Sequence, residues 1–253
     1  MVMHPPPSYC PQGEKRFCRL HKSLYGLKQA SRQWYSKLSH VLTLAGFCQS
    51  NANHNLFITT MGTMFTAILI YVDDILVIGN NLPTITTLKN HLATAFKIKD
   101  LGNLKYFLGI EITRSLAGIF FNQRKYILDI LSDASQLGSR PAYFPMEQHL
   151  KLNDIDGALV VDPASYRRLV GRLIYLTISH PDIAYTVNLL SHFMHAPREP
   201  HQQTAFRLLQ YLKTIPSYGL FFSSTYSFQL SAYCDSNWAS CPMTQWSTTD
   251  FVV

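Results

Sequence analysis

The segment from Phe65 to Ile78 reads FTAILIYVDDILVI and is the most informative part of the chain. Two apolar runs rich in Ile, Leu and Val flank the adjacent acids Asp73 and Asp74, a pattern that predicts two β-strands joined by a tight turn. Neighbouring carboxylates at the tip of a hairpin are the oxygen ligands that Mg²⁺ prefers, especially when phosphate oxygens complete its coordination shell. Aspartate is also common in plain turns because it hydrogen-bonds its own backbone, so the pair alone leaves both interpretations open.

The sequence on either side of the acidic pair predicts a mixture of strands and helices. Leu56 to Thr60 and Met64 to Tyr71 predict a hairpin across Gly62, and a third strand follows the acids. Apolar residues recur at helical spacing from Ser31 to Gly46 and again from Pro83 to Phe96. The serine and the glycine at the ends of the first of these segments are typical helix caps.

The remainder of the chain predicts two further strands, an irregular stretch and a set of helices. The runs Lys105 to Ile112 and Ile119 to Asn122 predict strands across a turn that contains Gly118, and a short helix follows from Gln123 to Ser132. Residues 139–162 show no sustained pattern and predict a linker or a domain boundary. Helices are then expected to begin at three prolines, which are Pro163, Pro181 and Pro200. After these helices, strand character returns from Tyr218.

Composition indicates a globular protein that is not secreted. The chain has 253 residues, of which 47% are hydrophobic, enough for a substantial core. It has no leading basic stretch followed by an apolar run, and its longest apolar runs fall short of a membrane span, so we expect no membrane partner. The five cysteines are scattered without a Cys-x-x-Cys pair, which predicts reduced thiols and no zinc site.

The net charge of +7 is concentrated at the amino-terminal end. Residues 1–50 contain seven basic residues against Glu14 alone, and aromatic side chains such as Tyr25 and Trp34 lie among them. Cations that meet phosphates and rings that stack on bases suit a polyanionic partner. A solvated basic face is the alternative, and the nearby acidic hairpin favours a substrate that carries phosphate.

Four segments, the acidic box among them, closely resemble the reverse transcriptase of copia-type LTR retrotransposons. They are LYGLKQASRQWY at residues 24–35, YVDD at 71–74, DLGNLKYFLGIE at 100–111 and YRRLVGRLIYL at 166–176. A fifth element, YCDSNWA at 233–239 with STT at 247–249, resembles the opening strand pair of that family's ribonuclease H domain. The ordered series spans essentially the whole chain and is far more specific than any single motif.

The resemblance implies roles for particular residues. Asp73 and Asp74 match the catalytic pair that binds Mg²⁺ for two-metal nucleotidyl transfer. The residues that match the family's nucleotide-binding positions are Tyr25, Gly26, Lys28, Gln29, Tyr71 and Val72. Phe107, Leu108 and Gly109 match the hairpin that grips the primer strand, although by pattern alone they belong to a hydrophobic strand. Asp235 matches an acid of ribonuclease H.

By this resemblance the fold class is α+β and the chain is a fragment of a Pol polyprotein. We expect a partial polymerase palm and fingers at residues 1–138, a helical region like the thumb and connection at 139–225, and the first strands of a ribonuclease H-like fold at 226–253. The implied partners are an RNA/DNA primer-template, deoxynucleotides and intact copies of the polymerase. Enzymes of the family work in cytoplasmic virus-like particles, and their DNA then reaches the nucleus.

Departures from the family pattern predict an enzyme that is incomplete by itself. The family has a third metal-binding aspartate on an earlier strand, whereas Glu14 is the only acid ahead of Asp73 here. Ribonuclease H chemistry needs several acids, and Asp250 is the only acid after Asp235. We therefore expect an inactive fragment. The alternative is a non-catalytic remnant that binds nucleic acid through its basic segment.

Three arginines and three histidines form two smaller groups whose pattern is less specific. Arg167, Arg168 and Arg172 fall on one predicted helix, where they either contact a nucleic-acid backbone or form a solvated face. The histidines His192, His195 and His201 have no nearby cysteine or ordered acid, so we expect them to be solvated and not to bind a metal.

Overall fold

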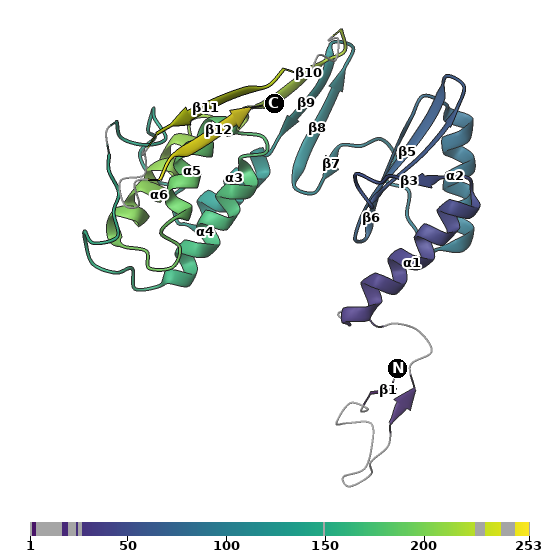
Figure 1. Cartoon of the computed structure of the whole chain (residues 1–253), viewed down its shortest axis with the longest axis horizontal. Coiled ribbons are helices and arrows are strands. Elements are labelled where there is room, and N and C mark those ends of the chain that lie inside the picture. The colour runs from purple at the N-terminus through teal and green to yellow at the C-terminus, as the bar shows by residue number, and fades with distance from the viewer. Residues whose placement is uncertain are drawn as a thin grey trace. The chain divides into compact units, whose positions relative to one another are not determined.

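The computed structural model describes residues 2–3, 17–19, 24, 27–148, 150–225, 231–238 and 246–252. The chain divides into two compact units, Met1–Gly102 and Asn103–Val253, and each has its own hydrophobic core (Figure 1). Helices and antiparallel sheets occur in both units, which confirms the α+β class. The assignment of polymerase subregions to residues 1–138, 139–225 and 226–253 stays a prediction.

A four-stranded antiparallel sheet forms the centre of the first unit. Its strands follow chain order and are β3 (Cys48–Gln49), β4 (Leu56–Met61), β5 (Met64–Tyr71) and β6 (Asp74–Gly79). Along β5 the side chains of Thr66, Ile68 and Ile70 are buried, while those between them are more exposed. This alternation follows from the two-residue period of a strand with one buried face. The predicted hairpin and third strand are confirmed.

Two helices supply the rest of this core. They are α1 (Lys28–Leu44), which contributes Leu38 and Leu42, and α2 (Leu82–Ala95), which contributes Leu88 and Leu92. Asn81 caps α2 by accepting a hydrogen bond from the Thr84 N–H at 3.0 Å. The predicted serine cap of α1 was wrong, because the helix begins at Lys28 after Leu27, which makes no side-chain cap bond. A short pair, β1 (Val2–Met3) and β2 (Cys18–Arg19), precedes the helix.

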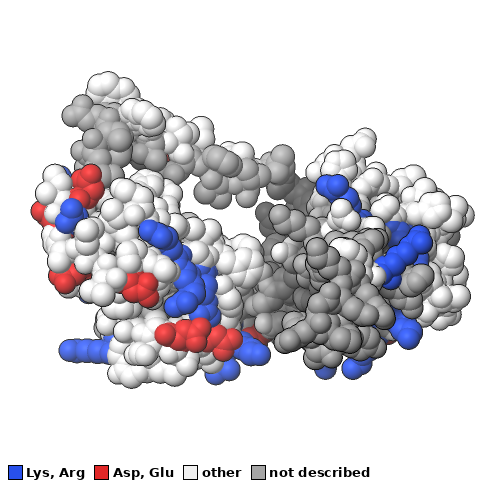
Figure 2. Space-filling model, turned by 90° about the horizontal axis from the view of Figure 1, so that it is seen from below, with Lys and Arg blue, Asp and Glu red and all other residues white. Residues whose placement is uncertain are grey.

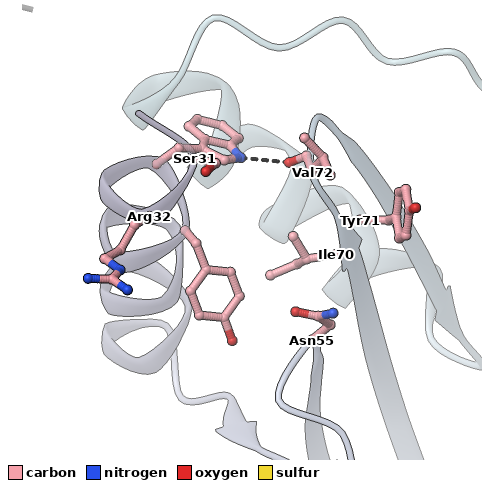
Figure 3. A pocket seen from close by; sticks show the side chains of 8 residues that line it. Ser31, Arg32, Asn55, Ile70, Tyr71 and Val72 are labelled. Atoms are coloured by element: carbon pink, nitrogen blue, oxygen red, sulfur yellow. Dashed lines mark hydrogen bonds between the residues drawn. The ribbon is translucent and has the colours of Figure 1, made fainter. Parts of the chain in front are cut away.

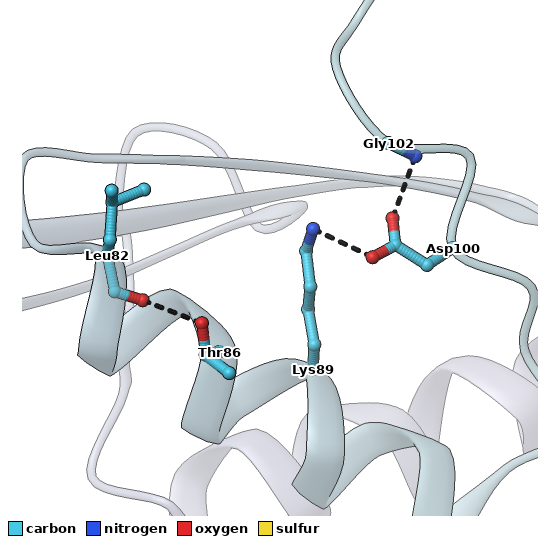
Figure 4. A network of polar contacts seen from close by, with 5 residues as sticks. All are labelled: Leu82, Thr86, Lys89, Asp100 and Gly102. Carbon is cyan, nitrogen blue, oxygen red and sulfur yellow. Dashed lines mark hydrogen bonds and ion pairs between the residues drawn. The ribbon is translucent and has the colours of Figure 1, made fainter.

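The segment that leaves α2 is held by an exposed acid. Asp100 accepts a hydrogen bond from Lys89 Nζ at 2.9 Å and another from the Gly102 N–H at 2.9 Å (Figure 4). The hydrogen bond from Lys89 is the largest cause of the lowered pKa of the Asp100 carboxyl, and the Gly102 N–H adds to it. Both partners are solvent-exposed, so this ion pair adds little to stability.

The second unit contains a separate four-stranded antiparallel sheet in the order β10-β9-β8-β7. These strands are β7 (Tyr106–Phe107), β8 (Ile110–Ser115), β9 (Gly118–Asn122) and β10 (Gly219–Ser223). The single strand predicted for residues 105–112 was wrong, because a two-residue turn at Leu108 and Gly109 divides it into β7 and β8. The pairing of β10 with β9 joins segments far apart in the chain.

Helices form the larger core of the second unit. They are α3 (Arg124–Asp133), α4 (Pro163–Leu176), the 3-10 turn Pro181–Ile183, α5 (Ala184–Ser191) and α6 (Glu199–Leu212). The helical segments predicted to begin at prolines are confirmed, although the segment at Pro181 opens with a 3-10 turn. Leu173, Leu208 and Leu212 are fully buried, so shortening any one of them to alanine costs about 2–5 kcal/mol.

His201 departs from the sequence expectation. It is buried and stacks on Phe193 with the ring centroids 3.9 Å apart. Its Nδ1 accepts a hydrogen bond from the Arg198 N–H at 3.0 Å at the start of α6, and its Nε2 lies 2.8 Å from the Asn153 carbonyl oxygen. The prediction of a solvated histidine was therefore wrong, because this imidazole satisfies the backbone at a helix end.

The last described strands form a hairpin-like pair, β11 (Tyr233–Asn237) with β12 (Thr248–Val252). They occupy most of the residues for which a strand pair was expected, while residues 226–230, the start of the expected ribonuclease H-like segment, lie outside the described residues. The described thiols Cys18, Cys48 and Cys234 are free. Across the described ranges, no helix has the length and apolar character needed to cross a membrane.

Candidate active site

The acidic pair lies at the tip of the hairpin formed by β5 and β6. Tyr71 pairs with Asp74 across the hairpin, so Val72 and Asp73 are its two loop residues. The side chains of Asp73 and Asp74 are both exposed. Buried Ile68 and Ile70 hold β5 against the core, and β6 is paired with β5 along its length. The position of the loop that joins the two strands is therefore fixed.

The backbone of this loop is strained at Val72. Its φ is +49°, in the left-handed region that β-branched residues rarely adopt. The φ of Asp73 is not positive, so only the first loop residue has this conformation, the pattern of a type II′ turn. A strained residue next to two exposed acids points to a functional site, since such strain persists only where surrounding structure enforces it.

Helix α1 contacts the loop directly. The Trp34 indole Nε1–H donates a hydrogen bond to the Val72 carbonyl oxygen at 2.8 Å (Figure 3). The Trp34 ring also meets Phe96 edge to face, with centroids 4.8 Å apart and an interplanar angle of 74°. Lys37 Nζ lies 5.1 Å from the centroid of the Phe96 ring. The indole is therefore held from two sides.

A cavity of about 500 Å³ opens between α1 and the end of β5. Figure 3 shows Ile70 directed into it, with Val72 at one end and Asn55 at the other, and Trp34 also lines it. Tyr35 lines the same wall and donates a hydrogen bond from its hydroxyl to the His54 carbonyl. Gln49 Nε2 donates to the Tyr35 hydroxyl at 2.7 Å, which fixes that wall. The cavity combines aromatic surface with a few polar groups, as small-molecule sites do.

The carboxylates of Asp73 and Asp74 are free to bind a cation. Within the described ranges of the chain, neither acid takes part in an ion pair. Carboxylate oxygens are hard ligands that suit Mg²⁺, so the pair fits part of a magnesium site. A complete set of ligands is not present there, since no group of three acids, histidines or cysteines that could hold a metal occurs among the described residues.

The other residues predicted to bind the nucleotide are only partly described. Tyr71 and Val72 flank the acids and are 52% and 57% exposed. Gln29 lies exposed in the first turn of α1. Lys28 begins that helix, and its side chain is outside the description, as are Tyr25 and Gly26 altogether. The structure thus brings the acids together with Tyr71 and Val72, and leaves the basic motif untested.

The predicted primer-grip residues form a tight turn in the second unit. Phe107 pairs with Ile110, and the loop residues Leu108 and Gly109 have φ of +50° and +81°, the pattern of a type I′ turn. The Tyr175 hydroxyl on α4 donates a hydrogen bond to the Leu108 carbonyl. Tyr175 in turn meets Tyr126 edge to face, with centroids 5.5 Å apart. Contacts from α3 and α4 therefore hold this turn.

Asp235 lies on β11 with its side chain exposed, and its backbone pairs in register with that of Asp250 on β12. A role in ribonuclease H chemistry stays a prediction for this residue. The contacts of Trp34 and Tyr175 with the two turns were missed by sequence reasoning. Both residues belong to the recognised motifs, but a sequence motif does not identify the contact partner of a side chain.

Comparison with known proteins identifies the family of the chain. Residues 1–148 match the family described as reverse transcriptase (RNA-dependent DNA polymerase). The Pol polyprotein from transposon RE1 of Arabidopsis thaliana is 39% identical over 254 residues, which cover 100% of this chain and 17% of the polyprotein. The Pol polyprotein from transposon TNT 1-94 of Nicotiana tabacum is 31% identical over 224 residues, which cover 84% of this chain and 17% of the polyprotein.

A shorter relative matches most of its own length. The uncharacterized mitochondrial protein AtMg00810 of Arabidopsis thaliana is 40% identical over 185 residues, which cover 73% of this chain and 76% of that protein. No solved structure matches the chain.

An acidic hairpin on an α+β fold and a family match over residues 1–148 define a polymerase-type domain: the chain belongs to the reverse transcriptase family. Its similarity to the polyproteins of RE1 and TNT 1-94 extends this to the Pol polyproteins of copia-type retrotransposons. The chain spans 17% of the length of each of these polyproteins. The expected resemblance is therefore confirmed.

Proposed function

We propose that the β5–β6 hairpin is the metal-binding end of a polymerase site that adds deoxynucleotides to a primer. The observation that carries this proposal is the exposed pair Asp73 and Asp74 on a strained two-residue loop, inside the residues that match the family. Asp73 and Asp74 would hold Mg²⁺, which supplies charge stabilisation to the attacking and leaving oxygens when it is bound. The hairpin holds both acids in one place before any ligand binds.

Other residues would bind the substrates around this pair. Tyr71 and Val72 flank the acids, and we propose that they contact the primer end and the incoming nucleotide. The remaining proposed nucleotide-binding residues are Tyr25, Gly26, Lys28 and Gln29. In the second unit, the tight turn at Leu108 and Gly109 with Phe107 beside it would grip the primer. The partners are accordingly a primer-template and deoxynucleotides, in cytoplasmic particles and later in the nucleus.

We further propose that these 253 residues do not extend a primer alone. Two divalent ions need more carboxylates than Asp73 and Asp74 supply, and no aspartate precedes Asp73 in the sequence. A further carboxylate would have to come from another segment or from an intact copy of the polymerase. Ribonuclease H activity would be absent for the same reason, because Asp250 is the only acid after Asp235.

A binding function without catalysis is the second candidate, and the arginines of α4 favour it. Arg167, Arg168 and Arg172 lie on this helix, which contains no acid. Figure 2 shows Lys and Arg side chains gathered in a band on the face of the helical unit turned to the viewer. Arg167 donates to the Met194 carbonyl oxygen and Arg172 pairs with Asp133, so Arg168 is the arginine of this helix best placed for a phosphate.

Primer extension tests the two candidates together. The purified chain is incubated with an RNA template, a DNA primer, deoxynucleotides and Mg²⁺, beside the variant Asp73→Asn and the control Asp129→Asn, which changes an exposed aspartate on α3. We expect salt-dependent binding of the primer-template without extension by any of the three. Extension that is lost only in Asp73→Asn would show that no further carboxylate is needed. Absence of binding would contradict both candidates.

A further inference from the structure

We infer that Trp34 is a positioning residue of the acidic hairpin: its indole N–H fixes the orientation of the peptide between Val72 and Asp73 and thereby aims both carboxylates. The strand ladder ends at the pair Tyr71 and Asp74, so the Val72 carbonyl lies outside it. Its hydrogen-bond partner is the Trp34 Nε1–H, at 2.8 Å. The donor comes from a residue 38 positions away in the chain.

The hydrogen bond acts on the one peptide that distinguishes the two common hairpin turns. Type I′ turns have positive φ at both loop residues, whereas type II′ turns have it only at the first. The two types differ by rotation of the peptide that joins the loop residues, and here that peptide carries the Val72 carbonyl. The loop has positive φ at Val72 and not at Asp73. A donor on the Val72 oxygen therefore favours the observed turn over its alternative.

The indole can do this because its own position is fixed. Phe96 meets its ring at a centroid distance of 4.8 Å, and Phe96 is 9% exposed at the end of α2. Trp34 itself extends from the first half of α1, whose residues Leu38 and Leu42 are fully buried. A donor held rigidly on α1 and against Phe96 can enforce a strained backbone, because the loop cannot relax without breaking the bond.

The orientation of this peptide determines how the two carboxylates lie. Rotation of the Val72–Asp73 peptide changes φ of Asp73 and so turns its side chain relative to that of Asp74. A site that holds a divalent ion needs its ligands within about 0.5 Å of the productive arrangement. The role of the acids as metal ligands rests on the proposed function, whereas the role of Trp34 in the turn does not.

Nuclear magnetic resonance on the full chain, with selectively labelled valine and aspartate, tests the turn itself. A type I′ turn brings the amide protons of Val72 and Asp73 close together, and a type II′ turn separates them. We expect a weak nuclear Overhauser effect between these protons in the native chain and a stronger one in Trp34→Phe, which keeps an aromatic ring against Phe96. Trp238→Phe is the matched control, since Trp238 is 89% exposed. An unchanged effect in Trp34→Phe overturns the inference.

Hydrogen exchange and Mn²⁺ binding provide two further tests of the inference. If Trp34→Phe fails to fold, hydrogen exchange of the Trp34 indole in the native chain decides, and rapid exchange overturns the inference. Line broadening of the Asp73 amide by Mn²⁺ measures metal binding, and we expect Trp34→Phe to weaken it between about twofold and tenfold, the range of one neutral hydrogen bond. Loss of the turn in Trp34→Phe without Mn²⁺ binding by any form would support the inference and contradict the proposed function.

Discussion

Removal of the Tyr166 hydroxyl should destabilise the helical core by about 1 kcal/mol. Tyr166 on α4 is 1% exposed, and its Oη donates a hydrogen bond to the Leu190 carbonyl oxygen at 2.9 Å. The Phe193 N–H also donates to this oxygen, at 3.2 Å, so the carbonyl keeps a partner in Tyr166→Phe. The cost is therefore that of one net hydrogen bond, about 0.5–1.5 kcal/mol, and not the larger cost of an orphaned buried acceptor.

Urea unfolding followed by circular dichroism measures this difference in the free energy of unfolding. In a thermal scan the same change lowers the melting temperature by about 2–4 °C for a protein of this size. Tyr185→Phe is the control, because Tyr185 lies on the neighbouring helix α5 and is 69% exposed. A loss above about 3 kcal/mol would contradict this expectation, since it would mean that the Leu190 carbonyl depends on Tyr166 alone. So would the absence of any loss.

Three other perturbations follow from the backbone and the buried imidazoles. Gly109→Ala should destabilise the second unit by about 1 kcal/mol in urea unfolding, because φ of +81° disfavours any side chain, and equal stability would contradict the left-handed turn. Gly171→Ala should stabilise α4 by about 1 kcal/mol in the same assay, because an added Cβ meets nothing within 4 Å, and a loss would show hidden crowding. Burial is the main cause that lowers the pKa of His180 and His201 below the ordinary 6.5, so the unfolded chain binds protons more readily than the folded one. The contribution of these histidines to the free energy of unfolding should be complete above about pH 6.5 and should be lost as the pH falls toward their folded-state pKa. His180→Gln should make the free energy of unfolding depend less steeply on pH. A free energy of unfolding that rises as the pH falls, measured by urea unfolding, would contradict the burial of neutral imidazoles.

Local patterns in the sequence predicted much of the fold. The alternation along residues 64–71 gave β5 and its buried face, because one side of that strand packs on the core. Pro163 and Pro200 marked the starts of α4 and α6, since proline fits the first turn of a helix and Asp162 adds a cap before Pro163. These features depend on neighbours in the chain, so a single sequence contains their signal.

Features that depend on distant residues were missed. The run from Lys105 to Ile112 is largely apolar, so its periodicity did not indicate the turn at Leu108, a residue that adopts positive φ without being glycine. The pairing of β10 with β9 and the burial of His201 both require tertiary contacts. The first helix begins at Lys28 without the expected serine cap, because packing of Leu38 and Leu42 outweighs the capping preference of Ser31.

In the candidate site, too, local features could be predicted from the sequence and contacts between distant residues could not. The position of Asp73 and Asp74 at a hairpin tip could be predicted, because the two flanking runs and the acids are contiguous. The strain at Val72 and its hydrogen bond from Trp34 could not, since they arise where α1 packs against the hairpin. The sequence predicts which groups carry the chemistry, and the packing determines how they are oriented.

A titration with Mn²⁺ shows whether the acidic pair Asp73 and Asp74 binds a divalent ion. Electron paramagnetic resonance of free Mn²⁺, titrated with the full chain, measures how many ions are bound and how tightly, and Mg²⁺ serves as the competitor. We expect weak binding that Mg²⁺ displaces, that Asp73→Asn abolishes and that Asp129→Asn leaves unchanged. Equal Mn²⁺ binding by the native chain and Asp73→Asn would contradict the claim that this hairpin is a metal site.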